Sequence, residues 1–341
     1  MARATQVQLA RLRPASWRRG MPQSQTAYVA VAFAALIVVI WALAPVFMTP
    51  RNLLNISKNF SFIALMSLGE TLVIISGGID LSVGSVCALS AVVTMMLLRF
   101  FSATAAAQVP GATITLAAIS ALALAALIGL TNGLLIARVR LSPFVTTLGM
   151  LSVARGMTYV VTQGRAQYPT GPDVAGFTRF ANGAVLGLPT QLVYLLVLAV
   201  LMALALRHLV WGRHLYAVGG NPQAAALTGV RVPRVIVSVY VLSGLAAGFS
   251  GMLIAGWLGA APANLATGYE LRVIAAAVIG GANLAGGVGG AAGAVLGAAL
   301  IEVIRNGFVL IGANTYWEEV FIGVIIIIAV LVDQLRTRRI L

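Results

Sequence analysis

Apolar stretches of about twenty residues recur along almost the whole chain, and they limit the possible folds more than any single motif does. A helix needs about 20 apolar residues to cross the hydrocarbon core of a bilayer. Of the 341 residues, 60% are hydrophobic and only 9% are charged, whereas a soluble domain usually carries about 25% charged residues. We therefore expect an all-α polytopic membrane protein. The even spread of the stretches excludes a soluble domain held by one anchor.

About ten transmembrane helices give the most consistent layout. The expected spans are 28–47, 60–77, 80–98, 112–137, 143–162, 190–207, 234–257, 270–286, 289–311 and 317–335. The expected organisation is a basic cytoplasmic tail at 1–27, a transmembrane domain at 28–335 and a second basic tail at 336–341. The first apolar stretch is long for a signal peptide, so we expect it to remain as an uncleaved span.

The formal net charge of +14 indicates an orientation in the membrane and not a nucleic-acid surface. On the ten-span layout, most basic residues fall on the side of the N-terminus. Loops rich in Arg and Lys stay in the cytoplasm, so both termini are expected there. No basic face with interleaved aromatic residues occurs, and we expect no nucleic-acid partner. Cys87 is the only cysteine, so the sequence supports neither a set of disulfides nor a cysteine-based metal site. We also expect no cofactor.

Glycine pairs interrupt the apolar run between 280 and 290. Irregular backbone survives at membrane depth only where it is buried in protein or faces water, so a broken or re-entrant helix is expected near 280–290. Close helix packing at small residues explains these glycines as well. A weak internal echo favours two pseudo-repeated halves: 77–81 resembles 280–284, and Asn132-Gly133 resembles Asn306-Gly307.

The connection at 208–233 carries the signals of a short capped helix. Asn221 is a good N-cap, Pro222 suits the first helical position, and Gly229 suits the residue past the end. A capped helix in this basic-flanked loop is typical of a docking element for another protein. An ordinary interfacial helix is the alternative interpretation.

This loop and four other segments resemble the sugar-importing ABC transporter permeases of the ribose type. The segments are GGIDLSVGS at 77–85, LSPFVTTLGMLSVARGM at 141–157, GGANLAGGVGG at 280–290 and NGFVLIGANTYWEEVFIGVIIIIAVLVD at 306–333. The likeness covers nearly the whole chain from about residue 50 onward. Several long motifs in the same order make it specific.

The resemblance implies the permease subunit of an ATP-driven importer in a bacterial cytoplasmic (inner) membrane, surrounded by lipid. It implies a cytoplasmic ATP-binding subunit, an extracytoplasmic sugar-binding protein and a second permease copy, either identical or a close homologue. The coupling helix would include Asn221, Pro222, Gln223, Ala225 and Gly229. The chain departs from the family pattern at Arg305 and Glu318-Glu319, and these changes bear on the substrate and not on the class.

Three ionisable residues in or beside the expected spans are candidates for pathway or gating roles. Glu70 lies inside the second span, where a structural pair with an arginine is the first expectation. Asp80 opens the third span and is expected to cap it. Arg155 needs a counter-charge, for which Glu70 or Asp80 is suitable, whereas Glu302 and Arg305 are spaced to pair on one helix.

A neutral sugar needs only hydroxyl, amide and aromatic groups along its pathway. Asn132, Thr146, Thr147 and Asn306 have this chemistry. Each of them is expected to bond a neighbouring helix before it touches a substrate.

Other candidate functions require particular residues that can be sought in the sequence. Gly248-Phe249-Ser250-Gly251 matches an intramembrane serine protease pattern, but no histidine follows His214 to act as the base. No second membrane aspartate supports an aspartyl dyad at Asp80, and His208 and His214 have no third metal ligand nearby. No phosphate-binding loop occurs, so ATP hydrolysis needs another chain. A stand-alone secondary transporter or channel, with Glu70 and Asp80 coupling ions, remains the serious alternative.

Overall fold

The computed structural model describes residues 25–312 together with residues 317, 320, 323, 324 and 327. The expected tail at 336–341, nearly all of the tail at 1–27 and most of the tenth span lie outside the described residues. In chain order the elements are α1 (Gln25–Leu43), η2 (Pro45–Met48), α2 (Pro50–Ile75), α3 (Val83–Ser102), η3 (Ala105–Gln108), α4 (Ala112–Ala137), α5 (Pro143–Thr162), α6 (Val174–Asn182), β1 (Ala184–Val185), β2 (Leu188–Pro189), α7 (Thr190–His208), α8 (Val210–Gly220), α9 (Pro222–Leu227), α10 (Val232–Leu258), α11 (Tyr269–Ile279) and α12 (Ala291–Leu310).

Seven of the helices in the described part are long and apolar enough to cross a bilayer: α2, α3, α4, α5, α7, α10 and α12. This confirms a polytopic, mainly helical membrane protein, but it does not confirm the expected count of ten spans. The eighth expected span, 270–286, is shorter than expected, because α11 ends at Ile279 after 11 residues. The chain then follows a non-helical path through the glycine loop, which we define as residues 280–290, before α12 begins.

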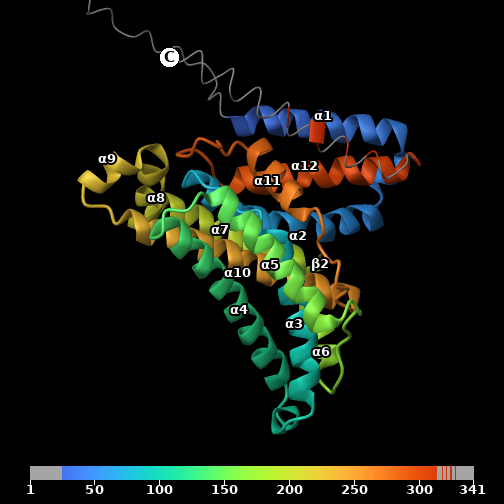
Figure 1. The fold of residues 1–341 in the computed structure, drawn as a ribbon. Helices are drawn as coiled ribbons and strands as arrows, with labels where there is room; N and C mark the ends of the chain where they lie inside the picture. Colours follow the sequence, from blue (N-terminus) through green and yellow to red (C-terminus); the bar gives the residue numbers. More distant parts are fainter. Residues whose placement is uncertain (1–24, 313–316, 318–319, 321–322, 325–326, 328–341) are drawn as a thin grey trace, which may run out of the picture.

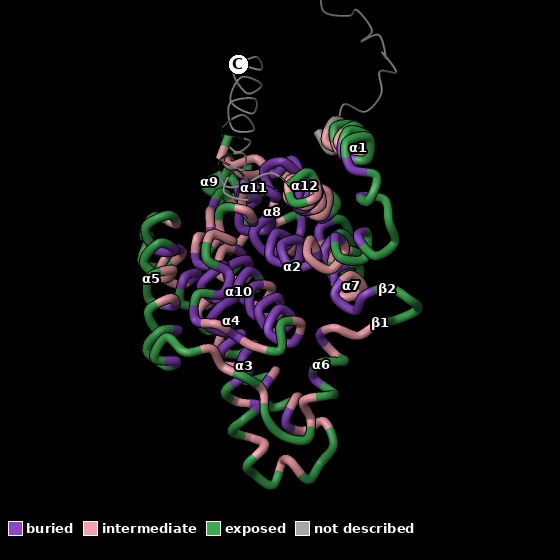
Figure 2. Tube along the Cα trace, turned by 90° about the vertical axis from the view of Figure 1, so that its right-hand side faces the viewer, coloured by how far each residue is buried: buried purple, intermediate pink, exposed green. Residues whose placement is uncertain are grey.

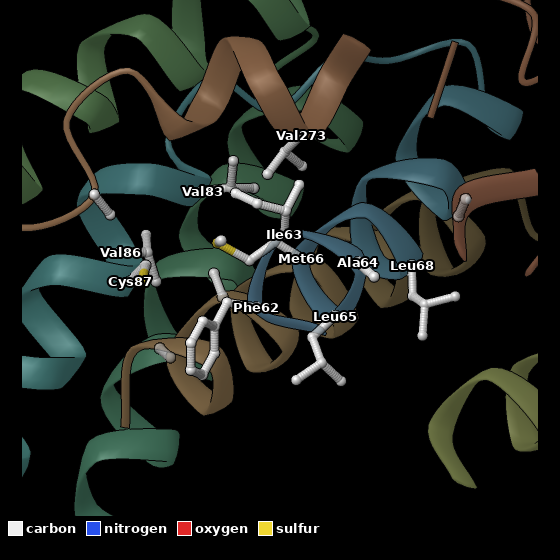
Figure 3. Close-up of a cluster of buried hydrophobic side chains, with 14 of the residues drawn as sticks. Phe62, Ile63, Ala64, Leu65, Met66, Leu68, Val83, Val86, Cys87 and Val273 are labelled. Atoms are coloured by element: carbon white, nitrogen blue, oxygen red, sulfur yellow. The ribbon is translucent and has the colours of Figure 1, made fainter. Parts of the chain in front are cut away.

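The core lies around α10, which packs against α2, α3 and α4 (Figure 2). In the apolar stretch of α2, 83% of the residues are buried, whereas in that of α5 only 22% are. Figure 3 shows how α2 divides its side chains: Ile63 points toward Val273 of α11, whereas Leu65 and Leu68 point to the opposite side of the helix. Helix α2 is therefore an interior helix, while α5 exposes most of its surface.

The connections gather at two ends of the molecule. Helices α8 and α9 protrude at one end, and α6 and the β1–β2 hairpin lie toward the other (Figure 1). At the second end, the main chains of Gln167 and Ala261 exchange two hydrogen bonds of 2.8 and 3.0 Å. Lys58 donates to Asn182 at 3.2 Å at this end as well. Loops that the sequence layout assigns to one side of the membrane therefore lie together.

Candidate functional site

Helix α9 is built as its sequence predicts. The side chain of Asn221 accepts a hydrogen bond of 2.9 Å from the main-chain N–H of Ala224, and Pro222 occupies the first turn. Gly229 has a φ of +87°, a conformation that favours glycine because it has no Cβ. The N–H of Gly229 donates to Ala226 O at 3.0 Å and that of Val230 to Ala225 O at 3.1 Å, which caps the carboxyl end. The prediction of a short capped helix is confirmed.

A second helix in the same connection was not expected. Residues Val210–Gly220 form α8, which leads directly into the N-cap Asn221. On α9 the Ala225 side chain is buried, whereas Leu227 is 90% exposed. The helix therefore presents one large apolar side chain to the outside, and α8 carries it at the end of the molecule.

The end of α8 lies in direct contact with two other segments. A Cβ on Gly219 would lie only 1.7 Å from the main-chain oxygen of Ile75 and 2.5 Å from the nitrogen of Gly287. The Gly287 N–H donates a hydrogen bond of 2.9 Å to Ile75 O. Tyr216 donates from its hydroxyl to Gly289 O at 2.8 Å. The glycine junction, as we call these contacts, joins α8, the end of α2 and the glycine loop.

The two segments of the sequence echo end their helices with the same geometry, but one residue out of register: the hydrogen bonds match Gly77 with Gly281, whereas the echo matches it with Gly280. Helix α2 ends with hydrogen bonds from Gly77 N to Ile74 O and from Gly78 N to Val73 O. Helix α11 ends in the same way, with bonds from Gly281 N–H and Ala282 N–H to the corresponding carbonyls of its last turn. Both ends thus form the same glycine-dependent cap. A Cβ on Gly286 would lie 3.2 Å from the Cα of Gly77, so the glycine loop contacts the turn after α2.

A buried polar network fills the turn between α2 and α3. Glu70 accepts a bond of 3.1 Å from the main-chain N–H of Asp80, and its Oε2 has no hydrogen-bond partner in the described part of the chain. Asp80 accepts from the Ser82 hydroxyl at 2.6 Å and from the Ser243 hydroxyl at 2.9 Å. Asn132 donates to the Ser82 hydroxyl at 3.1 Å. The network joins α2, α4 and α10 through the turn.

Two expectations for these acids were wrong. Asp80 does not cap α3, because that helix begins at Val83 and its N-cap residue, Ser82, makes no side-chain cap. The carboxylate of Asp80 instead accepts from the N–H of Ser82, which closes a turn just before the helix. Glu70 bonds to the main chain of that turn and not to an arginine.

Arg155 also has a different partner from the one expected. Its guanidinium donates at 2.7 Å to Leu265 O and at 3.5 Å to Ala263 O, both in the connection between α10 and α11. Main-chain oxygens therefore replace the expected carboxylate. The sequence carries no signal for this arrangement, because any residue provides a carbonyl oxygen.

The remaining candidate residues bond within the protein. Thr146 donates to Ser142 O at 2.9 Å within its own helix, whereas Thr147 donates both to its own helix and to Ile79 O at 3.2 Å. Thr147 thereby links α5 to the turn after α2. The structure thus brings Thr147, Glu70, Asp80 and Asn132 to the same region, and Thr146 lies beside Thr147 on α5.

Asn306 lies elsewhere, near the start of α2. It forms a reciprocal amide pair with Asn52, in which each Nδ2 donates to the other residue's Oδ1 at 2.9 Å. The expected local pair of Glu302 and Arg305 is confirmed, with Nη2 at 2.6 Å from Oε1. Sequence reasoning missed Asn52, since a lone asparagine 254 positions away gives no pairing signal.

The hydroxyl of Ser250, the residue of the serine protease pattern, takes part in helix packing. Ser250 donates to Phe62 O at 3.0 Å and is fully buried, so its hydroxyl holds α10 against α2. Within the described ranges, no group of three histidine, cysteine or acidic side chains could hold a metal ion.

Comparison with known proteins places this arrangement among transport proteins. The profile of the family described as "Branched-chain amino acid transport system / permease component" matches residues 52–330. The chain is 37% identical over 309 residues to the ribose import permease protein RbsC of Escherichia coli strain K12. The matched region covers 89% of this chain and 92% of that protein.

Two further relatives give similar values. The chain is 35% identical over 299 residues to RbsC of Bacillus subtilis strain 168, with 88% of this chain and 89% of that protein covered. It is 37% identical over 316 residues to the galactose/methyl galactoside import permease protein MglC of Escherichia coli strain K12, with coverages of 91% and 94%. No solved structure gives a significant match.

Proposed function

This chain belongs to the ABC permease family described as "Branched-chain amino acid transport system / permease component", and we propose that it conducts a monosaccharide or a related polyol across the membrane. It is the membrane-spanning subunit of an ABC importer and not an enzyme. The family description names amino acids, whereas the relatives that cover about nine-tenths of the chain are named for ribose and galactose. Their full-length similarity is the observation that carries the proposal.

An ABC importer takes its energy from a separate ATP-binding subunit, and we propose α9 as the docking element for it. The proposed contact residues are Asn221, Pro222, Gln223, Ala225 and Gly229. The support is geometric: α9 is short, capped at both ends and exposed at one end of the molecule (Figure 1). Leu227, 90% exposed, supplies the apolar side chain that such a contact buries.

We propose that movement of α9 reaches the membrane helices through α8 and the glycine junction. The Tyr216–Gly289 hydrogen bond and the Gly219–Ile75 contact join α8 to two helix ends at once. The α2 end continues into the turn that holds Asp80 and contacts Thr147. Glu70, Asp80, Asn132, Thr146, Thr147, Arg155 and Asn306 are therefore proposed as packing and gating residues and not as direct sugar ligands.

The assembly proposed around this chain has two permease copies, identical or closely related, that enclose the pathway. The proposed topology keeps ten spans within the 28–335 domain, with both termini in the cytoplasm of a bacterium. The end with α9 then faces the ATP-binding subunit. The opposite end, with α6 and the hairpin, faces the sugar-binding protein. Each set of loops gathers at one end, as this topology requires.

The test is co-purification from native membranes followed by uptake in proteoliposomes. The tagged full chain is expected to bring down an ATP-binding subunit, and the chain that lacks residues 222–228 is expected to lose it while still inserting into the membrane. Uptake of ribose and galactose is then measured with and without ATP. Transport without ATP by the chain alone would support a stand-alone transporter. Retention of the ATP-binding subunit after the deletion would contradict the assignment of α9.

A further inference from the structure

An apolar groove runs along the outside of the core between the helices that lead into and out of the α8–α9 connection. It has a volume of about 460 Å³ and is lined by residues of α2, α4, α7, α8 and α10. Leu201 and Ala205 of α7 form one wall, and Leu245 and Ala246 of α10 form the other. Leu65 and Leu68, which point away from Ile63 in Figure 3, belong to its floor.

The chemistry of the lining excludes a polar occupant. The groove is lined by side chains of Leu, Met, Ala, Phe and Trp together with one glycine. Water needs two to four polar partners in such a place, and a sugar needs more. The groove is therefore separate from the pathway that the proposed function requires.

The groove is continuous with the surface that the spans present to the bilayer. Leu198 and Leu201 line it and are 37% and 55% exposed, and the neighbouring Val197 and Val200 are exposed on the same helix. The Trp211 indole lines the groove from α8 and donates to the Ser238 hydroxyl at 2.8 Å. Phe249 lines it from α10, and its ring lies 5.6 Å from that of Tyr194.

The shape of the groove favours a lipid tail over a helix from another chain. The floor from Leu65 to Leu72 measures about 10 Å at 1.5 Å per helical residue. A flexible hydrocarbon chain can lie inside a groove of this length and a volume of about 460 Å³. A rigid helix about 10–12 Å in diameter would insert only the side chains of one face.

We propose that this groove holds one acyl chain of a membrane phospholipid. The chain packs between α7 and α10, which flank the α8–α9 connection, and it contacts Trp211 at the beginning of α8. A bound tail thus fixes the spacing of the two helices that carry α9. Removal of the lipid is expected to loosen the link between ATP hydrolysis and transport.

The first test is native mass spectrometry of the full chain after stepwise removal of detergent and lipid. The wild type is expected to retain one phospholipid per chain, and Ala205→Trp, which fills the groove, is expected to retain none. Ala203→Trp is the matched control, because Ala203 is an exposed alanine on the same helix outside the groove. Equal retention by the wild type and Ala205→Trp, or none in the wild type, would overturn the proposal.

A second measurement keeps the proposal testable if Ala205→Trp does not fold. A chain with Trp211 as its only tryptophan is placed in vesicles of brominated phosphatidylcholine, and Ala246→Leu narrows the groove from α10. Strong quenching of the Trp211 fluorescence by the bromine atoms, reduced in the Ala246→Leu variant, supports the proposal. Equal quenching with and without Ala246→Leu contradicts it. Leu198→Cys forming a disulfide between two copies would show a protein occupant instead. None of these measurements uses transport, so their outcome is independent of the proposed function.

Discussion

The hydroxyl of Tyr216 donates a hydrogen bond of 2.8 Å to the main-chain oxygen of Gly289, which joins α8 to the glycine loop before α12. Burial raises the pKa of the Tyr216 phenol, so the group remains a protonated donor throughout the physiological range. The bond connects the segment that carries α9 to a helix end 73 residues away in sequence. It is a direct side-chain link between α8, which leads into the proposed docking element, and the loop before α12.

Replacement of this tyrosine tests the link. Tyr216→Phe keeps the ring but removes one hydrogen bond, which contributes about 1 kcal/mol. We expect the ATP-binding subunit to remain bound and the sugar transported per ATP hydrolysed in proteoliposomes to fall several-fold. An unchanged ratio would show that the coupling does not pass through this bond.

Two adjacent glycines give a matched test of the glycine junction. Gly219→Ala places a Cβ 1.7 Å from Ile75 O and 2.5 Å from Gly287 N. Both are main-chain atoms, which cannot move aside as a side chain can. At Gly220 a Cβ meets nothing within 4 Å. We expect Gly219→Ala to lower the thermal stability of the purified chain by several degrees and to abolish uptake, whereas Gly220→Ala stays close to the wild type. Equal behaviour of the two variants would refute the close contact.

The exposed leucine of α9 predicts the strength of the docking contact. Full burial of a leucine side chain contributes about 1.5–3 kcal/mol, which corresponds to about 10-fold or more in the dissociation constant. Leu227→Ser is therefore expected to weaken binding of the ATP-binding subunit by at least that factor, as measured by titration in detergent. Ala226→Ser, an exposed neighbour on the same helix, is the control and should change the affinity little.

The reciprocal amide pair predicts a coupling between the start of α2 and the end of α12. Asn306→Ala removes both bonds and leaves Asn52, which is buried and also donates to Phe47 O, without one partner. The expected loss of stability is about 1–3 kcal/mol. A double-mutant cycle with Asn52→Ala, read by thermal unfolding, should be non-additive. Additive losses would mean that the pair contributes nothing of its own.

The end of the molecule that carries α6 has a pH-dependent contact. The Thr113 hydroxyl and the Gly111 N–H donate to Asp173, and these bonds lower the pKa of its carboxyl group. A lowered pKa gives stability that is present above the unfolded value of about 3.9 and is lost as the pH falls through the folded value. The difference in melting temperature between the wild type and Asp173→Asn should therefore be largest near neutral pH. It should shrink as the pH falls below about 4. A constant difference across this range would contradict the contact.

Properties that depend on neighbouring residues could be predicted from the sequence. The apolar stretches indicated a polytopic membrane protein, because the length and composition of a segment decide whether it can cross a bilayer. The caps of α9 were predictable for the same reason: Asn221, Pro222 and Gly229 act on main-chain groups within a few residues of themselves. The interruption after Ile279 followed from the glycines that occupy it.

Only the tertiary structure decided which distant groups meet. Asp80 could be expected to cap a helix, and Arg155 to find a carboxylate, but Asp80 bonds to Ser243 and Arg155 to Leu265 O. The Tyr216–Gly289 bond and the Asn52–Asn306 pair likewise join segments far apart in the chain. Hydropathy and capping describe how a segment interacts with membrane or water and with its own backbone. Which polar groups pair inside the protein depends on how the helices pack, because each buried group must take its partner from whatever the packing brings within reach.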